Sequence, residues 1–251
     1  MITHLSRKRA HFTAAASALA LSLRYGRRLG IRSKEWVRYL KKSISLGLCY
    51  AGLGTQGTLR EAWKAGEAAF FSTAYDVVTD WRGFDPKARG RFEQILSSRN
   101  VEPSLRSMAI AVYLHKQHNQ LKEDGFERGI AGLRFVLGMM DCVRARETAW
   151  SDLDEVGRLL QIVDDVLDLE DDVRRGDVNC LTTPRRDSYL RKLMLGFGRG
   201  EVTRLFGDSR LVIVMVVEKA LLKAQRLLGD RTEVVPFVPL DFPAGSTDPI
   251  K

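Results

Sequence analysis

The chain has few of the residues that crosslink or interrupt a small protein. Its 251 residues include seven prolines and three cysteines, and no apolar run reaches the roughly 18–20 residues of a membrane span. We therefore expect no integral membrane segment. The sparse, odd number of cysteines shows no metal-ligand spacing and argues against a disulfide framework. Structural thiols in a reducing compartment are the simpler interpretation, so we expect a cytoplasmic protein.

Strand-like alternation of polar and apolar residues is short wherever it occurs. Long helical periods dominate instead, which predicts an all-α fold. We see no repeat and no linker, so the sequence favours one helical domain over residues 1–233, followed by an irregular, proline-containing tail at 234–251. Helices are expected at residues 5–29, 33–52, 57–82, 86–99, 103–121, 126–147, 150–175, 187–206 and 209–228.

The net charge of the chain is +9. The basic residues are spread through the sequence, with clusters at Ser6–Arg9, Arg24–Arg28 and Lys41–Lys42. Such a balance suits nucleic acid, an anionic membrane surface or a phosphorylated substrate. Because no nucleic-acid-binding motif accompanies the clusters, we do not expect a nucleic-acid partner. The first basic cluster precedes an apolar run, Phe12–Leu23, which we interpret as an amphipathic first helix rather than a cleaved signal peptide.

Acidic residues are concentrated in one segment, Gln161–Leu181, with the sequence QIVDDVLDLEDDVRRGDVNCL. Asp164, Asp168 and Asp172 are four residues apart, so on an α-helix they share one face. Three carboxylates in a row repel one another unless a cation lies among them. Oxygen-only ligands suit a hard cation such as Mg²⁺, which usually also binds a phosphate.

A solvated helix face is the simplest alternative for such an acidic run. Against it, apolar residues interleave with the acids throughout Leu159–Leu169. A helix that is apolar on most sides packs against other helices, and buried carboxylates need partners or metal. We therefore expect the acids to face an internal cavity.

A second acidic pair, Asp76 and Asp80, lies in the segment AAFFSTAYDVVTDWRG near the end of another predicted helix. Alone, the pair is better explained as a solvated helix end. Together with the later cluster, it predicts two acidic helix faces across a bundle. Several Mg²⁺ ions held between such faces would clamp a diphosphate and neutralise its charge as it leaves.

These motifs resemble those of the all-α isoprenoid synthases, which include terpene synthases, prenyl diphosphate synthases and squalene/phytoene synthases. Asp164, Asp165, Asp168 and Asp172 fall at the four positions of the terpene synthase pattern N-D-x-x-S-x-x-x-E. The G-D-V-N segment that follows, residues 176–179, is similar to the G-D-x-x-N of that family. The resemblance implies a single helical bundle around a central active-site cavity, with Asp164, Asp168 and Asp172 as metal ligands.

The same segment is also similar to the patterns of two other branches. Gln161, Asp164, Asp165 and Asp168 match the prenyltransferase pattern F-Q-x-x-D-D-x-x-D. The squalene/phytoene synthase pattern is met by Gln161, Asp168, Asp171, Asp172 and Gly176. In the first motif Tyr75 replaces one Asp of the common D-D-x-x-D, and a single arginine, Arg82, remains of the basic stretch with which chain-elongating enzymes bind a second diphosphate.

The resemblance further implies ionisation of an allylic prenyl diphosphate of C15 or C20 length. Three Mg²⁺ ions, with Mn²⁺ as an alternative, would be held by Asp76, Asp80, Asp164, Asp168 and Asp172. Side chains expected to contact the substrate are Arg82, Arg128, Arg134, Arg175, Phe71, Tyr75 and Gln161. The aromatic residues either line an apolar pocket for the prenyl chain and carbocation or pack as ordinary core.

A terpene synthase-like lyase that cyclises or rearranges the carbocation is our first interpretation. A prenyltransferase that joins prenyl diphosphates is the second. A catalytically silent homologue that binds a prenyl compound or a partner protein is the third. A helical phosphohydrolase is less consistent with the sequence, because the four histidines lie away from the acidic motifs. The sequence leaves a homodimer open.

Overall fold

The structure is a computed structural model that describes residues 7–51, 58–82, 85–107, 126–140, 150–176, 179–198 and 218–229. These segments are helical and contain no β-strand, which confirms the all-α prediction. The α-helices are α1 (Arg7–Tyr25), α2 (Trp36–Ala51), α3 (Leu59–Asp76), α4 (Pro86–Ser98), α6 (Phe126–Met140), α8 (Trp150–Arg175), α9 (Arg186–Gly198) and α12 (Glu218–Leu228). Shorter helical turns are η1 (Ser33–Glu35), η2 (Val77–Trp81) and η4 (Cys180–Thr182).

The predicted helix boundaries differ from the observed ones at several ends. The first helix ends at Tyr25 rather than at residue 29, and a turn leads through Gly30, which has the positive φ that glycine tolerates. The predicted α-helix over 57–82 changes to a π-helical turn at Val77. Parts of the predicted helices at 103–121, 126–147, 187–206 and 209–228, and the predicted tail at 234–251, lie outside the described residues.

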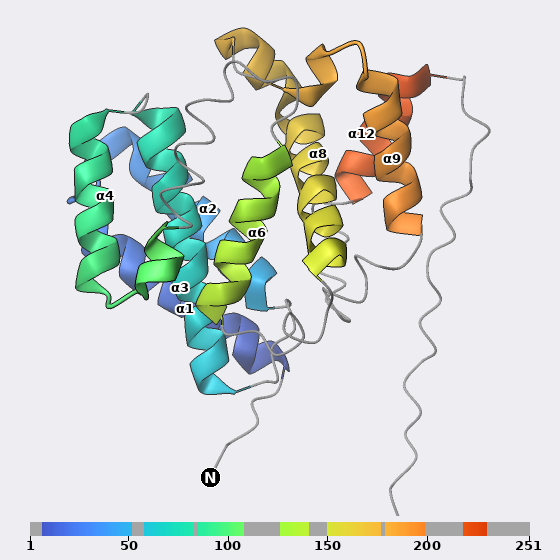
Figure 1. Ribbon diagram of the computed structural model, residues 1–251. Helices are drawn as coiled ribbons and strands as arrows, with labels where there is room; N and C mark the ends of the chain where they lie inside the picture. The colour runs from blue at the N-terminus through green and yellow to red at the C-terminus, as the bar shows by residue number, and fades with distance from the viewer. Residues whose placement is uncertain are drawn as a thin grey trace, which may run out of the picture.

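Helices α1, α2 and α3 pack against one another (Figure 1), and small residues line their contacts. A Cβ added to Gly66 on α3 would lie 2.3 Å from the Ala14 carbonyl oxygen on α1, and one on Gly47 of α2 would lie 3.0 Å from the same oxygen. A side chain larger than hydrogen at these positions would push the helix backbones apart.

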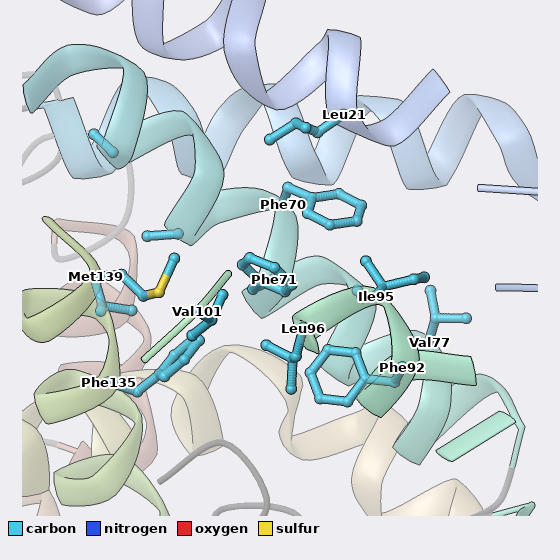
Figure 2. Close-up of a cluster of buried hydrophobic side chains, with 14 of the residues drawn as sticks. Leu21, Phe70, Phe71, Val77, Phe92, Ile95, Leu96, Val101, Phe135 and Met139 are labelled. Carbon is cyan, nitrogen blue, oxygen red and sulfur yellow. The ribbon is translucent and has the colours of Figure 1, made fainter. Parts of the chain in front are cut away.

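The largest group of buried apolar side chains joins these helices to α4 and α6 (Figure 2). Phe71 lies at its centre, and its ring centroid is 5.1 Å from that of Phe70 and 6.3 Å from those of Phe92 and Phe135. Tilted and edge-on arrangements of this kind are the favourable ones for aromatic pairs. The cluster fixes α3 against α4 on one side and against α6 on the other.

Helix α6 lies between α3 and α8, and α9 and α12 lie on the other side of α8 (Figure 1). The α6–α8 contact is close because two glycines meet there. A Cβ on Gly129 would lie 2.4 Å from the Gly157 carbonyl oxygen, and a Cβ on Gly157 would lie 2.7 Å from Ile130 Cα. This contact determines how near the side chains of α6 come to the acidic segment of α8.

The second half of α8 packs against α9, η4 and α12 through a separate apolar cluster. Ile162, Val163 and Val166 are the buried residues that α8 contributes to it. Asp164 lies between these positions and Asp168 follows them, and both are on the exposed side of the helix. None of the helices in the described segments is long and apolar enough to cross a membrane.

Candidate functional site

The acidic face of α8 is open to solvent at its middle. The Asp164 side chain is 64% exposed and Asp168 is also exposed, whereas Asp172 is 13% exposed. The expectation that all three carboxylates are enclosed is therefore wrong for Asp164 and Asp168. The three side chains share one face of the helix, as their spacing predicts, and that face is not covered by the apolar clusters.

Asp168 has an unfavourable environment for a carboxylate. Although its side chain is accessible to solvent, neighbouring protein atoms partly replace the water around it, and this burial raises its pKa to about 6. The negative charges of Asp164 and Asp172 raise the pKa further, while Lys42 and Arg175 oppose the shift. A carboxylate held among like charges is stabilised by a cation, which is the property expected of a metal ligand.

Asp165 points away from this face and has a different role. It is 4% exposed and accepts hydrogen bonds from Gln161 Nε2 (2.7 Å) and from the backbone N–H of Cys180 (2.7 Å). Burial raises the pKa of Asp165, whereas Arg128 and the Cys180 N–H lower it. The second carboxylate of the D-D pair therefore anchors the segment after α8 to the helix.

Asn179 completes this anchor. Its Nδ2 donates to the backbone oxygen of Asp165 (2.8 Å) and to Asp172 Oδ2 (2.9 Å), and its Oδ1 accepts from the Leu181 N–H (2.9 Å). The chain can turn back toward α8 because Gly176 ends the helix with a φ of 71°. Asn179 thus orients Asp172.

Two of the predicted substrate-binding arginines lie at the acidic face. Arg128 on α6 donates from Nε to Gln161 Oε1 (3.0 Å) and from Nη2 to Asp164 Oδ2 (3.5 Å). Arg175 donates from Nη2 to Asp172 Oδ1 (2.6 Å). A guanidinium that already contacts a carboxylate oxygen can also contact a phosphate oxygen brought to the same place.

Asp76 of the second acidic motif pairs with a lysine that also interacts with the acidic segment of α8. Lys42 on α2 lies 2.5 Å from Asp76 Oδ2 at the end of α3. The same ammonium group is close enough to lower the pKa of Asp168 on α8. Asp76 and Lys42 also affect the pKa of Tyr50, which burial raises to about 12. Lys42 therefore pairs with Asp76 and lies close enough to Asp168 to interact with it electrostatically.

The backbone at the second motif is not the α-helix that the sequence predicts. Val77–Trp81 forms a π-helical turn, and Thr79 Oγ1 donates to the carbonyl oxygens of Tyr75 (3.2 Å) and Asp76 (3.5 Å) within it. Such turns are frequent at functional sites. The α-helical spacing argument therefore does not apply to Asp80, whose side chain lies outside the described residues.

Arg82, a predicted diphosphate ligand, is engaged elsewhere. Its Nη2 donates to Glu35 Oε2 (2.6 Å) and to the Gly30 carbonyl oxygen (2.6 Å), and its Nη1 donates to Glu35 Oε1 (3.1 Å). The hydrogen bonds and charge of Arg82 lower the pKa of Glu35 to about 2. Arg82 thereby ties the end of η2 to the turn between α1 and η1.

We predict that Glu35→Gln lowers the free energy of unfolding at neutral pH by about 1–2 kcal/mol, after allowance for solvent screening. Because the pKa of Glu35 is lowered from 4.5 to about 2, its stabilising effect is present above pH 4.5 and is lost as the pH falls toward 2. Urea unfolding of both proteins across this range measures the difference. Glu93→Gln, which removes the more exposed Arg89–Glu93 pair, is the control and is expected to change stability by less than about 0.5 kcal/mol. Equal effects of the two variants would contradict the prediction.

The remaining predicted residues are distributed between core and surface. Arg134 binds Asp154 through two hydrogen bonds of 3.0 and 2.7 Å, and Asp154 precedes Asp164 by about 15 Å along the helix axis. Phe71 is fully buried in the aromatic cluster of Figure 2. Tyr75 is half-buried and packs against that cluster.

The donor chemistry of the acidic faces fits a hard cation. Asp164, Asp168, Asp172 and Asp76 offer oxygen ligands only, and the raised pKa of Asp168 reflects repulsion that a cation would relieve. Within the described segments, no three acidic, histidine or cysteine side chains converge as a ready-made metal site. Ions would have to draw these carboxylates together.

Lys42 is the residue of this region that sequence reasoning missed as a site residue. The sequence marks it only as half of a Lys41–Lys42 pair. Its position within α2 gives no indication that it meets Asp76, 34 residues later. Only the packing of α2 against α3 brings the two side chains together.

Comparisons with protein-family models, with curated proteins and with solved structures found no match to this chain.

Proposed function

We propose that the protein catalyses the Mg²⁺-dependent ionisation of an allylic prenyl diphosphate, followed by cyclisation or rearrangement of the carbocation. The observation that carries this proposal is that one lysine interacts with a carboxylate of each acidic motif. Lys42 contacts Asp76 on one face and acts electrostatically on Asp168 of the other. Acidic motifs with basic groups beside them suit a polyanion that binds together with metal ions.

The acidic residues of the site would bind the metal ions, and the basic residues would bind the substrate. Asp76, Asp164, Asp168 and Asp172 would hold the ions, with Asp80 as a further ligand in the proposal. Bound Mg²⁺ supplies Lewis-acid neutralisation of the diphosphate leaving group.

The basic side chains would hold diphosphate oxygens directly. Lys42, Arg128 and Arg175 each already contact a carboxylate of the site. Since cleavage of the carbon–oxygen bond places charge on the leaving diphosphate, these donors would stabilise that charge as it develops. Asn179 and Asp165 would keep Asp172 and the loop after α8 in place.

The position of Arg82 favours the lyase over a chain-lengthening transferase. The resemblance gives this arginine as the remaining cation of the first motif for a second diphosphate, and its guanidinium is bound to Glu35 and Gly30. The G-D-V-N segment supports neither branch, because it is one residue shorter than the G-D-x-x-N of terpene synthases. Asn179, the last residue of this segment, instead donates a hydrogen bond to the backbone of α8 at Asp165.

Incubation with farnesyl and geranylgeranyl diphosphates, each with and without isopentenyl diphosphate, tests the proposal. We expect diphosphate release and a hydrocarbon or alcohol from one allylic substrate alone. Removal of Mg²⁺ with a chelator should abolish the release, and Mn²⁺ should restore part of it. A strict requirement for isopentenyl diphosphate or for a second allylic substrate would identify a transferase. The absence of release from every substrate would favour a silent binding homologue.

A further inference from the structure

The basic excess of the chain is confined to its first 51 residues. They contain 11 lysines and arginines and one acidic residue, Glu35, whereas residues 52–251 contain 29 basic and 30 acidic residues. Basic residues do occur throughout the sequence, as expected, but after residue 51 acidic residues balance them. The positive charge originates in α1, α2 and the connection between them.

Much of this charge is exposed where α1 leads into α2. We call residues 23–41 the basic corner, and its exposed basic side chains are Arg24, Arg27, Arg28, Arg32, Lys34, Arg38 and Lys41. Its one acidic residue, Glu35, is ion-paired with Arg82 from η2. Trp36 packs against Gly26, so the end of α1 and the start of α2 are held together. The basic corner therefore holds several exposed positive charges on a backbone that is packed in place.

Apolar side chains are exposed within and beside the basic corner. Leu23 is 54% exposed and Val37 is 80% exposed. Along α1, Phe12 is 75% exposed, and Ala16 and Ala20 are exposed on the same side of the helix. Between Arg9 and Arg24 the outer side of α1 has no lysine, arginine or acidic residue. An outward-facing helix side is normally polar.

We propose that α1 and the basic corner dock onto an anionic phospholipid surface. The arginines and lysines would lie at the phosphate headgroups, where each adds roughly 1 kcal/mol of attraction. Phe12, Leu23 and Val37 would enter the boundary between headgroups and acyl chains. Exposed apolar groups combined with clustered cations are the two signals that bind a protein segment to an anionic bilayer surface.

Charge and side-chain type favour a bilayer over other partners. A symmetric contact between two copies of the chain would place the same cations against one another. Single-stranded nucleic acid is bound by stacking on several aromatic side chains, whereas of the exposed apolar side chains Phe12, Leu23 and Val37 in this surface one is aromatic and two are aliphatic. The proposal stands on this surface alone and does not depend on the proposed reaction.

Co-sedimentation of the full chain with phospholipid vesicles tests the electrostatic part. We expect binding to vesicles of phosphatidylcholine mixed with phosphatidylglycerol, little binding to phosphatidylcholine alone, and a loss of binding as salt is added. The double variant Arg27→Glu with Lys34→Glu should bind anionic vesicles at least about tenfold more weakly. The control, Arg185→Glu with Arg191→Glu, reverses two exposed arginines outside the basic corner and should bind like the unchanged protein.

The apolar part has a matched pair of variants. Leu23→Ser and Leu195→Ser replace two leucines that are both 54% exposed, and only Leu23→Ser should weaken binding. Several results would overturn the proposal: no binding to anionic vesicles, equal binding to neutral ones, equal effects of the paired variants, preferential binding of RNA, or self-association that the basic-corner variants abolish. Circular dichroism of each variant confirms that these exposed substitutions leave the helices intact.

Discussion

Asp168→Asn is expected to stabilise the metal-free protein and to abolish its Mg²⁺-dependent diphosphate release. A pKa raised from 3.8 to about 6 means that the folded state disfavours the charged carboxylate. The shift corresponds to about 3 kcal/mol, which solvent screening reduces to about 1 kcal/mol because Asp168 is exposed. Asparagine removes the charge and with it the repulsion from Asp164 and Asp172. Loss of one metal ligand should lower the release rate by ~100-fold or more.

The pH dependence has a definite sign. Because the pKa of Asp168 is higher in the folded state, protonation stabilises the unchanged protein below pH 3.8, and this advantage is lost as the pH rises through about 6. The variant lacks the titrating group. The two proteins should therefore differ little in stability near pH 4 and differ by the full amount above pH 6. Urea unfolding in the presence of a chelator measures the difference.

Asp171→Asn is the matched control for this experiment. Asp171 lies on the same helix, is exposed, and pairs with Arg174 rather than with the acidic face. Its replacement should leave diphosphate release unchanged and should not raise stability. If Asp168→Asn were more stable but equally active, the electrostatic description would hold and the proposed function would be wrong. If Asp168→Asn were no more stable, the electrostatic description itself would be contradicted.

Gly157→Ala is expected to destabilise the fold, whereas Gly132→Ala is expected to stabilise it. The new Cβ at Gly157 would lie 2.7 Å from Ile130 Cα and 3.1 Å from the Gly129 carbonyl oxygen, both backbone atoms that cannot turn aside. Separating α8 from α6 should lower the free energy of unfolding by about 1–3 kcal/mol. A Cβ at Gly132 on α6 would meet nothing within 4 Å, so the higher helix propensity of alanine should add about 0.5–1 kcal/mol.

Chemical unfolding of the two variants measures how the same substitution changes the free energy of unfolding where a neighbouring backbone is in contact and where the space is empty. The Gly157 variant should also lose diphosphate release, because Arg128 reaches Gln161 and Asp164 only across the close α6–α8 contact. Equal stability of both variants would show that Gly129 and Gly157 do not hold α6 and α8 in close contact. Destabilisation without loss of activity would separate this contact from the site.

The residues that could be predicted from sequence are those whose placement depends on local geometry. The common face of Asp164, Asp168 and Asp172 follows from the α-helical repeat alone, and α8 confirms it. Arg175 reaches Asp172 because it follows three residues later on the same helix. The interleaved apolar residues likewise predict a packed helix, and Ile162, Val163 and Val166 are buried.

The other assignments depend on contacts between distant residues. Arg82 and Arg134 follow or precede acidic motifs in sequence, yet their guanidinium groups bind Glu35 and Asp154. An arginine side chain is long and flexible, so its partner is set by which acid the packing brings within reach. Periodicity cannot distinguish Phe71 in a closed aromatic core from the same residue lining a pocket.

The sequence by itself determined that this protein is helical and that three carboxylates share one side of a helix, because backbone hydrogen bonding fixes the repeat regardless of what surrounds it. Only the tertiary structure decided that Asp165 turns inward to the Cys180 N–H while Asp168 stays at the surface. It also decided that Lys42 pairs with Asp76 and interacts electrostatically with Asp168 of α8. The Asp165–Cys180 contact joins residues 15 apart, and the Lys42–Asp76 contact joins residues 34 apart. The second depends on the packing of α2 and α3, because Gly47 and Gly66 let both helices lie close to Ala14 of α1.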